Sequence, residues 1–198
     1  MLSPIYAVTD TETGGLSPEK NALLQVSIII VDSDFNEIET FAHKILPRPG
    51  YSVEPGAAAV NGYTQEEWER TGMDADHADR AYSAFLDQFF KGTPAVGVAH
   101  NAAFDAKFLA HHMPSTYTRY LALGDERTRK LHEGWYCTMV HLKEWRQRCK
   151  FAGSNKLADL AAVAGYTVQG KAHDAMTDTR TCLAGMRWLQ EHKTESYL

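Results

Sequence analysis

A ten-residue run of apolar and mostly β-branched side chains, Ala22–Val31, constrains the fold more than any other segment. Such a run is typical of a strand that is largely buried in the interior of a sheet. Turn residues follow at Asp32–Asn36, and Ile38–Leu46 then has the composition of a partner strand. The two segments therefore predict a hairpin at the centre of a sheet.

The rest of the chain predicts strands early, helices late, and alternation of the two in the second half. The shorter expected strands are Tyr6–Thr13, Ala95–Ala99 and Trp135–Cys137. Pro47–Gly56 is expected to be a loop, and Thr64 to begin a short helix. The longer expected helices are Asp74–Lys91, closed by Gly92, then Ala102–His112, a segment ending near Arg148, Asn155–Ala164 and about His173–His192. This order predicts a single α/β domain over residues 1–198 with a mixed sheet.

The bulk composition narrows the class of protein. A net charge of −5 argues against a non-specific nucleic-acid coat, which would be basic. Three cysteines are too few for a disulfide framework, which favours a reducing compartment. The chain has no apolar run of membrane-spanning length and no signal-peptide pattern at its start. We therefore expect a cytoplasmic protein without a membrane partner.

Two carboxylates lie at the end of the first expected strand. Asp10 and Glu12 are two positions apart, so they share one face of that strand. Like charges held side by side repel each other unless a cation lies between them. A hard divalent ion is the cation that carboxylate oxygens prefer. This pair alone is a weak signal, because such spacings arise by chance in an acidic chain.

Two further segments combine acids with histidine. Asp105 follows His100-Asn101 where a strand gives way to a helix, the place where open α/β sheets bind ligands. Asp178 lies five residues after His173, at the start of the last helix. Each has a structural alternative: Asp105 as a first-turn helix acid, Asn101 as a helix cap, and His173 as a capping or exposed histidine.

Taken together, these segments resemble the three motifs of the DEDDh superfamily of 3′→5′ exonucleases. The matching residues are Asp10-x-Glu12, His100-Asn101-x-x-Phe104-Asp105 and His173-x-Ala175-x-x-Asp178, in the family's order and spacing. The resemblance spans about residues 5 to 190. It implies an RNase H-like mixed β-sheet of about five strands flanked by helices. One departure is Gln25, where many members have a glutamate.

The resemblance also implies a site and a reaction. It assigns two Mg²⁺ or Mn²⁺ ions to Asp10, Glu12, Asp105 and Asp178, and the role of general base to His173. Thr13, Leu16 and Asn101 fall where the family contacts the 3′ nucleotide. The expected activity is removal of nucleotides from the 3′ end of single-stranded nucleic acid, with DNA favoured. RNA ends, short oligoribonucleotides, and a catalytically silent binding module stay open as alternatives, as does a polymerase or repair partner.

Basic residues gather in two stretches, for which contact with phosphates behind the terminal nucleotide is one interpretation. One consists of Arg127, Arg129 and Lys130, and the other of Lys143, Arg146, Arg148, Lys150 and Lys156. Basic runs are common on exposed helices, so a solvated helix face is the favoured interpretation of both.

Overall fold

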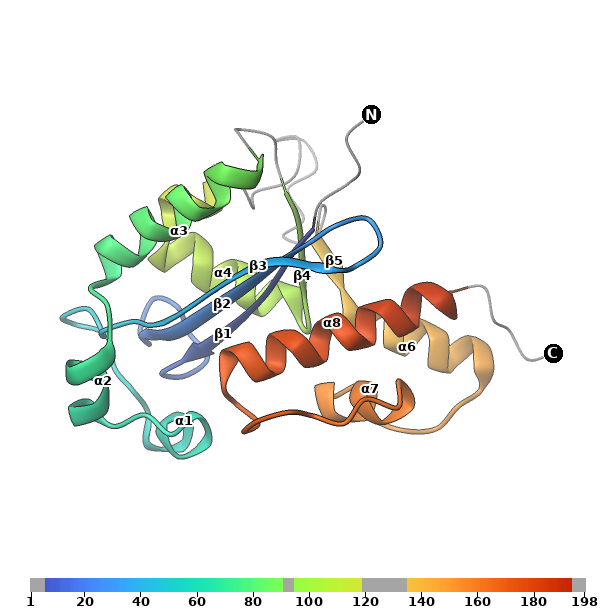
Figure 1. Cartoon of the computed structure of the whole chain (residues 1–198). Coiled ribbons are helices and arrows are strands. Elements are labelled where there is room, and N and C mark those ends of the chain that lie inside the picture. The colour runs from blue at the N-terminus through green and yellow to red at the C-terminus, as the bar shows by residue number, and fades with distance from the viewer. Residues whose placement is uncertain (1–5, 91–94, 119–134, 194–198) are drawn as a thin grey trace.

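A computed structural model describes residues 6–90, 95–118 and 135–193 (Figure 1). Its strands are β1 (Tyr6–Thr13), β2 (Leu23–Val31), β3 (Glu37–Lys44), β4 (Val96–Ala99) and β5 (Trp135–Cys137). Its helices are α1 (Pro55–Asn61), α2 (Gln65–Thr71), α3 (Ala75–Phe90), α4 (Ala102–His112), α5 (Pro114–Thr116), α6 (Thr138–Cys149), α7 (Leu157–Val163) and α8 (Ala175–Glu191).

The strands form one five-stranded mixed sheet in the order β3-β2-β1-β4-β5. The pairs β1–β2 and β2–β3 are antiparallel, whereas β1–β4 and β4–β5 are parallel. Every residue of β2 is buried, as expected for a strand with neighbours on both sides and helices on both faces. The predicted central hairpin and α/β fold class are confirmed.

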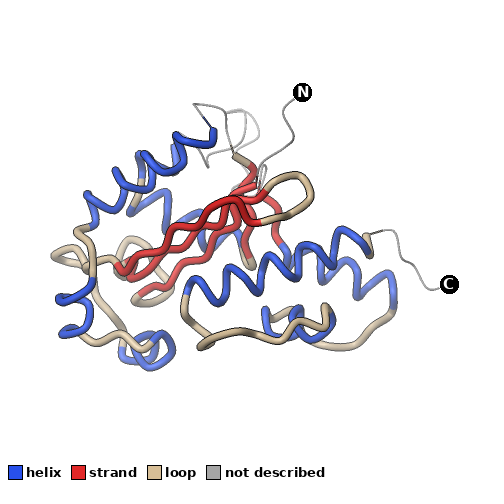
Figure 2. The backbone as a smooth tube through the Cα atoms, viewed as in Figure 1, coloured by secondary structure: helices blue, strands red, loops and turns tan. Residues whose placement is uncertain are grey.

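Helices cover the sheet in two layers (Figure 2), and the side chains of its strands alternate between them. Ala7, Ile28 and Ile30 pack in the cluster formed with α3 and α4. Val8, Ile29 and Val31 pack in the cluster formed with Cys182, Leu183 and Met186 of α8. Because strand side chains alternate strictly, the position of Val8 places Asp10 and Glu12 on the α8 side.

Helices α6 and α7 extend the α8 layer on the side away from the sheet (Figure 1). Leu142 and Trp145 of α6 and Leu160 of α7 share a buried cluster with Leu189 of α8. This layer anchors the segment that enters α8. Within the described residues, none of the helices combines the length and apolar character that crossing a membrane requires.

Three expectations about local structure need comment. The prediction of a loop over Pro47–Gly56 is wrong for its last two residues, because α1 starts at Pro55. Proline is well accommodated in a first helical turn. The last helix starts at Ala175, two residues later than expected. Gly92 and the basic residues Arg127, Arg129 and Lys130 lie outside the described residues.

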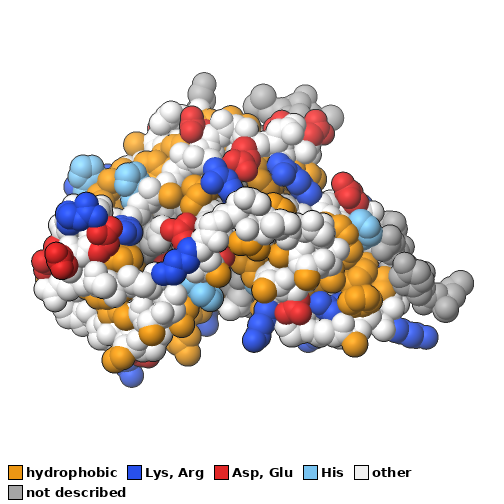
Figure 3. Space-filling model, turned by 60° about the horizontal axis from the view of Figure 1, so that its bottom comes forward, with side chains coloured by type: hydrophobic (Ala, Val, Ile, Leu, Met, Phe, Trp, Pro, Cys, Tyr) orange, Lys and Arg blue, Asp and Glu red, His pale blue; other side chains and the backbone are white. Residues whose placement is uncertain are grey.

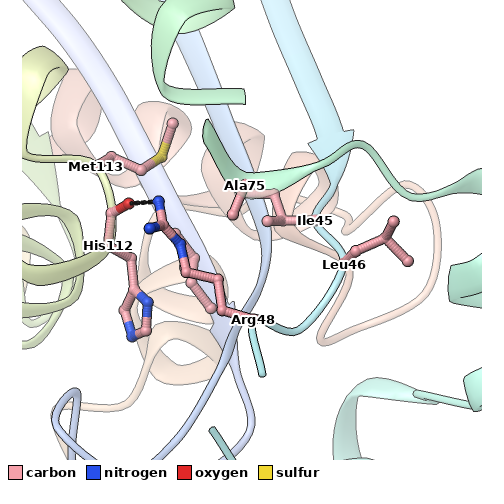
Figure 4. A pocket seen from close by; sticks show the side chains of 7 residues that line it. Ile45, Leu46, Arg48, Ala75, His112 and Met113 are labelled. Carbon is pink, nitrogen blue, oxygen red and sulfur yellow. Dashed lines mark hydrogen bonds between the residues drawn. The ribbon is translucent and has the colours of Figure 1, made fainter. Parts of the chain in front are cut away.

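A small cavity of about 10 Å³ lies between α4, the end of β3 and the start of α3 (Figure 4). It has room for about one water molecule and none for a substrate. His112 borders it, buried to 4% exposure, and its Nε2 donates to the Asn21 carbonyl at 3.1 Å. Burial, with the positive charges of His111 and Arg48 nearby, lowers the pKa of His112 to about 4. This region is structural.

Candidate active site

The carboxyl end of β1 presents the first two acids. Asp10 is half-buried and Glu12 is 8% exposed, opposite Ser27 and Gln25 of β2. A register shift between Glu12 and Thr13 ends the regular pairing. The chain then turns at Gly14, where a β-carbon would collide with the Ser52 carbonyl, so this close approach needs glycine.

Asp105 reaches the same end of β1 from the opposite helix layer. Strand β4 pairs with β1 at Tyr6–Val8 and no further, which leaves the edge of β1 open beyond Val8. Asp105 of α4 occupies this edge, and its Oδ1 accepts the Thr11 backbone N–H at 3.0 Å and the Thr11 hydroxyl at 2.8 Å. The acid is 3% exposed, so these hydrogen bonds fix its side chain beside Asp10.

The start of α8 supplies the third group. His173 precedes the helix with φ +61°, and its backbone N–H donates to Asp178 Oδ2 at 3.2 Å. Its ring Nδ1 lies 3.9 Å from the same oxygen. Ligand atoms of Glu12, His173 and Asp178 all lie within 4.8 Å of one another. A residue pair five positions apart therefore converges because His173 lies outside the helix.

Burial raises the pKa of all four acids, and repulsion from the other site acids adds to this for Asp10 and Glu12. Burial, reinforced first by Asp105 and then by Glu12, raises the pKa of Asp10 well above its usual value. Burial and the charge of Asp178 raise the pKa of Glu12 to about 8. Asp105 rises to about 7 through burial, against the two Thr11 hydrogen bonds, and burial also raises the pKa of Asp178. Each acid is therefore within electrostatic range of the others.

This donor set fits divalent metal ions. No lysine or arginine among the described residues forms an ion pair with these acids; the ion pair of Asp178 is with His173. Raised carboxyl pKa values without a balancing cation indicate a cluster that is stable in its charged form only when a cation is bound. Oxygen donors from carboxylates are the ligands that Mg²⁺ and Mn²⁺ prefer.

The three residues expected to contact substrate lie in different surroundings. Leu16 is 83% exposed on the loop after β1, an unusual position for a large apolar side chain. Asn101 is the N-cap residue of α4, as its structural alternative supposed, but it has φ +77° and its side chain makes no capping hydrogen bond. Thr13 is 9% exposed, and its hydroxyl donates to the Gly15 carbonyl at 2.7 Å within the loop.

Sequence reasoning missed several residues that hold the site together. Thr11 positions Asp105, and only the tertiary fold shows this. Asp174, expected in the first turn of the last helix, is instead its N-cap and accepts the Thr177 N–H at 3.2 Å. Gln25 donates to Asp174 at 3.3 Å. The amide at this position therefore anchors the start of α8 to the sheet.

Two hollows flank His173. One, of about 600 Å³, is bordered by Asn101, Asp178 and apolar side chains of α6 and α7. The other, of about 440 Å³, lies toward α1 and α2 and is bordered by Asn61 and Lys171. Figure 3 shows a hollowed region on one face of the molecule, with acidic and histidine side chains close to it. His173 is therefore open on both sides, and Asp178 is open to the larger hollow.

Comparisons with known proteins show the family to which the chain belongs. A protein-family model described as "Exonuclease" matches residues 7–185. An uncharacterized exonuclease, CP81, of Escherichia phage 186 is 30% identical over 178 residues, which cover 88% of this chain and 82% of the phage protein. Ribonuclease T of Wigglesworthia glossinidia brevipalpis is 30% identical over 120 residues, 57% of this chain and 56% of that enzyme.

Among solved structures, the fold is similar to that of E. coli exonuclease I in a zinc-bound complex with single-stranded DNA. The TM-score is 0.71 at 21% identity, with 96% of this chain and 41% of that chain covered. This likeness confirms the expected RNase H-like arrangement of a five-stranded sheet between helices.

Proposed function

The chain belongs to the exonuclease family whose model spans residues 7–185, and from this premise we propose that it is a metal-dependent 3′→5′ exonuclease acting on single-stranded nucleic acid. The observation that supports this most is the convergence of four acids and one histidine from three separate segments. Phosphodiester hydrolysis needs an activated water and relief of negative charge at phosphorus. A silent binding module has no need to bear the electrostatic cost of so many buried acids.

The residues that would hold two divalent ions, Mg²⁺ or Mn²⁺, are Asp10, Glu12, Asp105 and Asp178. When bound, such ions supply charge neutralisation at the phosphate and a more acidic water. The protein's own contribution is to hold the carboxylates in place before substrate arrives. Thr11 does this for Asp105, and the His173 backbone N–H does it for Asp178.

His173 is the proposed general base. Its ring is within ion-pair distance of Asp178, and its side chain is 56% exposed, so it can reach a water at the site and release the proton to solvent. An imidazole ring is a common general base in enzyme sites. The distances of its ring to the Glu12 and Asp178 oxygens would also allow it to bind metal, but its solvent access favours proton transfer.

The proposed substrate is a free 3′ end. Leu16 projects from the loop beside the acids, where an apolar side chain can pack against a terminal base. The side chain of Asn101 makes no capping hydrogen bond, so its amide is available to a nucleotide in the hollow that it borders. DNA is the favoured substrate, because the similar exonuclease I structure holds single-stranded DNA. The similarity to ribonuclease T makes RNA the second candidate.

The test uses 5′-labelled DNA and RNA oligonucleotides, each with a free or blocked 3′ end, in Mg²⁺, in Mn²⁺ and in EDTA. We expect a metal-dependent ladder of products that shorten from the free 3′ end. The nucleic acid that is cleaved faster, DNA or RNA, identifies the substrate class. Cleavage that survives exhaustive chelation would exclude the proposed mechanism.

Two aspartate-to-asparagine variants, one inside the acid cluster and one outside it, test the role of the cluster in the same assay. Asp10→Asn removes one site carboxylate, and Asp34→Asn removes an exposed one in the β2–β3 turn. We expect the first to abolish turnover and the second to match wild type. Equal activity in both variants under saturating metal would refute the role of the acid cluster.

A further inference from the structure

A third hollow, of about 440 Å³, lies at the carboxyl end of α6 and in the loop that follows it. Its charged lining residues are all basic: Lys143, Arg146 and Lys150. Both lysines are exposed, and the nearby Phe151 is 52% exposed. An aromatic ring among cations is the combination with which proteins bind single-stranded nucleic acids.

Arg146 is unusual because it is a buried cation. It is 7% exposed, and no carboxylate pairs with it among the described residues. Glu144, the closest acid on the helix, pairs with His141 at 3.3 Å. The Nε atom of Arg146 is buried without a hydrogen-bond partner in the described structure. Buried charges are normally paired, so this guanidinium lacks an anion.

The loop after α6 is shaped around this arginine. Nη1 of Arg146 donates to the Ala152 carbonyl at 2.6 Å, and the guanidinium lies 5.3 Å from the Phe151 ring centroid. At Gly153, with φ +144°, a β-carbon would collide with the guanidinium. The side chain is therefore held in one orientation at the wall of the hollow, which favours a geometrically specific ligand such as a phosphate.

The basic hollow adjoins the hollow that opens beside the acid site. Asn155 borders both this hollow and the 600 Å³ hollow, and the latter is also bordered by His173 and Asp178. Helices α6, α7 and α8 lie together on this side of the sheet (Figure 1). A strand with its 3′ end at the acids can therefore run past Asn155 to the basic hollow.

We infer that the hollow formed by Lys143, Arg146 and Lys150 is a subsite for the phosphodiester backbone of the substrate, upstream of the nucleotide that is removed. This inference rests on the proposed exonuclease function. The phosphate supplies the anion that Arg146 lacks, the lysines add charge at the rim, and Phe151 offers a face for a base. The enzyme then retains its substrate between cuts although its net charge is −5.

The structure also divides the basic stretch that the sequence presents as one. Lys143, Arg146 and Lys150 border the hollow, whereas Lys156 borders the neighbouring one. Arg148 points elsewhere, and its Nη2 donates to the Lys193 carbonyl at 3.0 Å. The interpretation of the whole stretch as a solvated helix face is thus incomplete, because Arg146 is buried.

The experiment compares wild type with the Lys143→Ala/Lys150→Ala double variant, and uses Lys107→Ala as the control. Lys107 is an exposed lysine on α4 that borders neither hollow. Hydrolysis of a dinucleotide and of an oligonucleotide of about 12 residues is measured at about 50 to 200 mM salt. Binding of the labelled oligonucleotide in EDTA is followed in parallel by fluorescence anisotropy.

We expect the double variant to raise the KM for the longer substrate about tenfold, with kcat and dinucleotide hydrolysis unchanged. The slope of log affinity against log salt should fall by about 1.4, since each single-strand phosphate contact contributes about 0.7. Arg146→Met should act in the same direction. A merely structural arginine would instead lower thermal stability and leave the salt slope unchanged.

The outcomes separate this subsite from the proposed function. If wild type cleaves and the double variant has the same KM and affinity at every substrate length and salt concentration, the subsite is refuted and the proposed exonuclease function is kept. If wild type does not cleave but its binding depends on Lys143 and Lys150, the subsite stands and the exonuclease is refuted. Absence of both cleavage and binding refutes both.

Discussion

Replacing Glu12 with glutamine should make the metal-free protein more stable while abolishing its activity. Glu12 is 8% exposed, and burial together with Asp178 raises its pKa from 4.5 to about 8. At pH 7 the folded, metal-free protein therefore keeps a proton that the unfolded chain releases. One pKa unit is equivalent to about 1.4 kcal/mol, so the 2.5 units between 4.5 and 7 cost about 3 kcal/mol of folding free energy.

The sign of this effect sets its pH window. A carboxyl group with a raised folded-state pKa stabilises the fold fully below pH 4.5, and this stability is lost as the pH rises toward 8. Glutamine has nearly the same shape and no titration. We therefore expect Glu12→Gln to gain about 3 kcal/mol, or roughly 6–12 °C in Tm, at pH 7, and to match wild type near pH 4.5.

The assay is urea unfolding in EDTA, followed by tryptophan fluorescence at both pH values. Glu66→Gln, an exposed carboxylate in α2, serves as the control and should change stability by no more than about 0.5 kcal/mol. Adding Mg²⁺ should stabilise wild type more than Glu12→Gln. A variant that is less stable than wild type at pH 7, or that gains equally at both pH values, would refute the reasoning.

Three further predictions concern single residues. His173→Ala should lower turnover by about 10²–10⁴-fold without changing the thermal unfolding curve, and wild-type rates under saturating metal would contradict its role as base. The pKa of His112 is lowered from 6.5 to about 4, so the free energy of unfolding should fall by about 3 kcal/mol as the pH drops through that interval. His112→Gln should flatten this dependence of stability on pH, as measured by urea unfolding. Gly97→Ala would place a β-carbon 2.5 Å from the Trp135 ring, and should lower the free energy of unfolding by about 1–3 kcal/mol in the same assay. An unchanged urea midpoint would contradict this, because it would mean that Trp135 of β5 moves aside at little cost.

The properties that follow from the sequence alone are those set by local pattern. The buried run at Ala22–Val31 and the turn after it predict the central hairpin, because strand alternation and turn chemistry act over a few residues. The two-residue spacing of Asp10 and Glu12 places them on one face for the same reason. The helix α1 escaped prediction because its start at Pro55 lies in a stretch rich in proline and glycine.

Only the tertiary structure decides which distant groups meet. Asp105 reaches Asp10 because β4 stops early and leaves the Thr11 N–H open, 94 residues away in the chain. His173 meets Asp178 because a residue with positive φ lies just outside the helix. Arg146 is buried against the loop after α6, where no carboxylate of the described residues pairs with it. Burial, shared electrostatic fields and open strand edges depend on the packing of several elements, so no local pattern in the sequence encodes them.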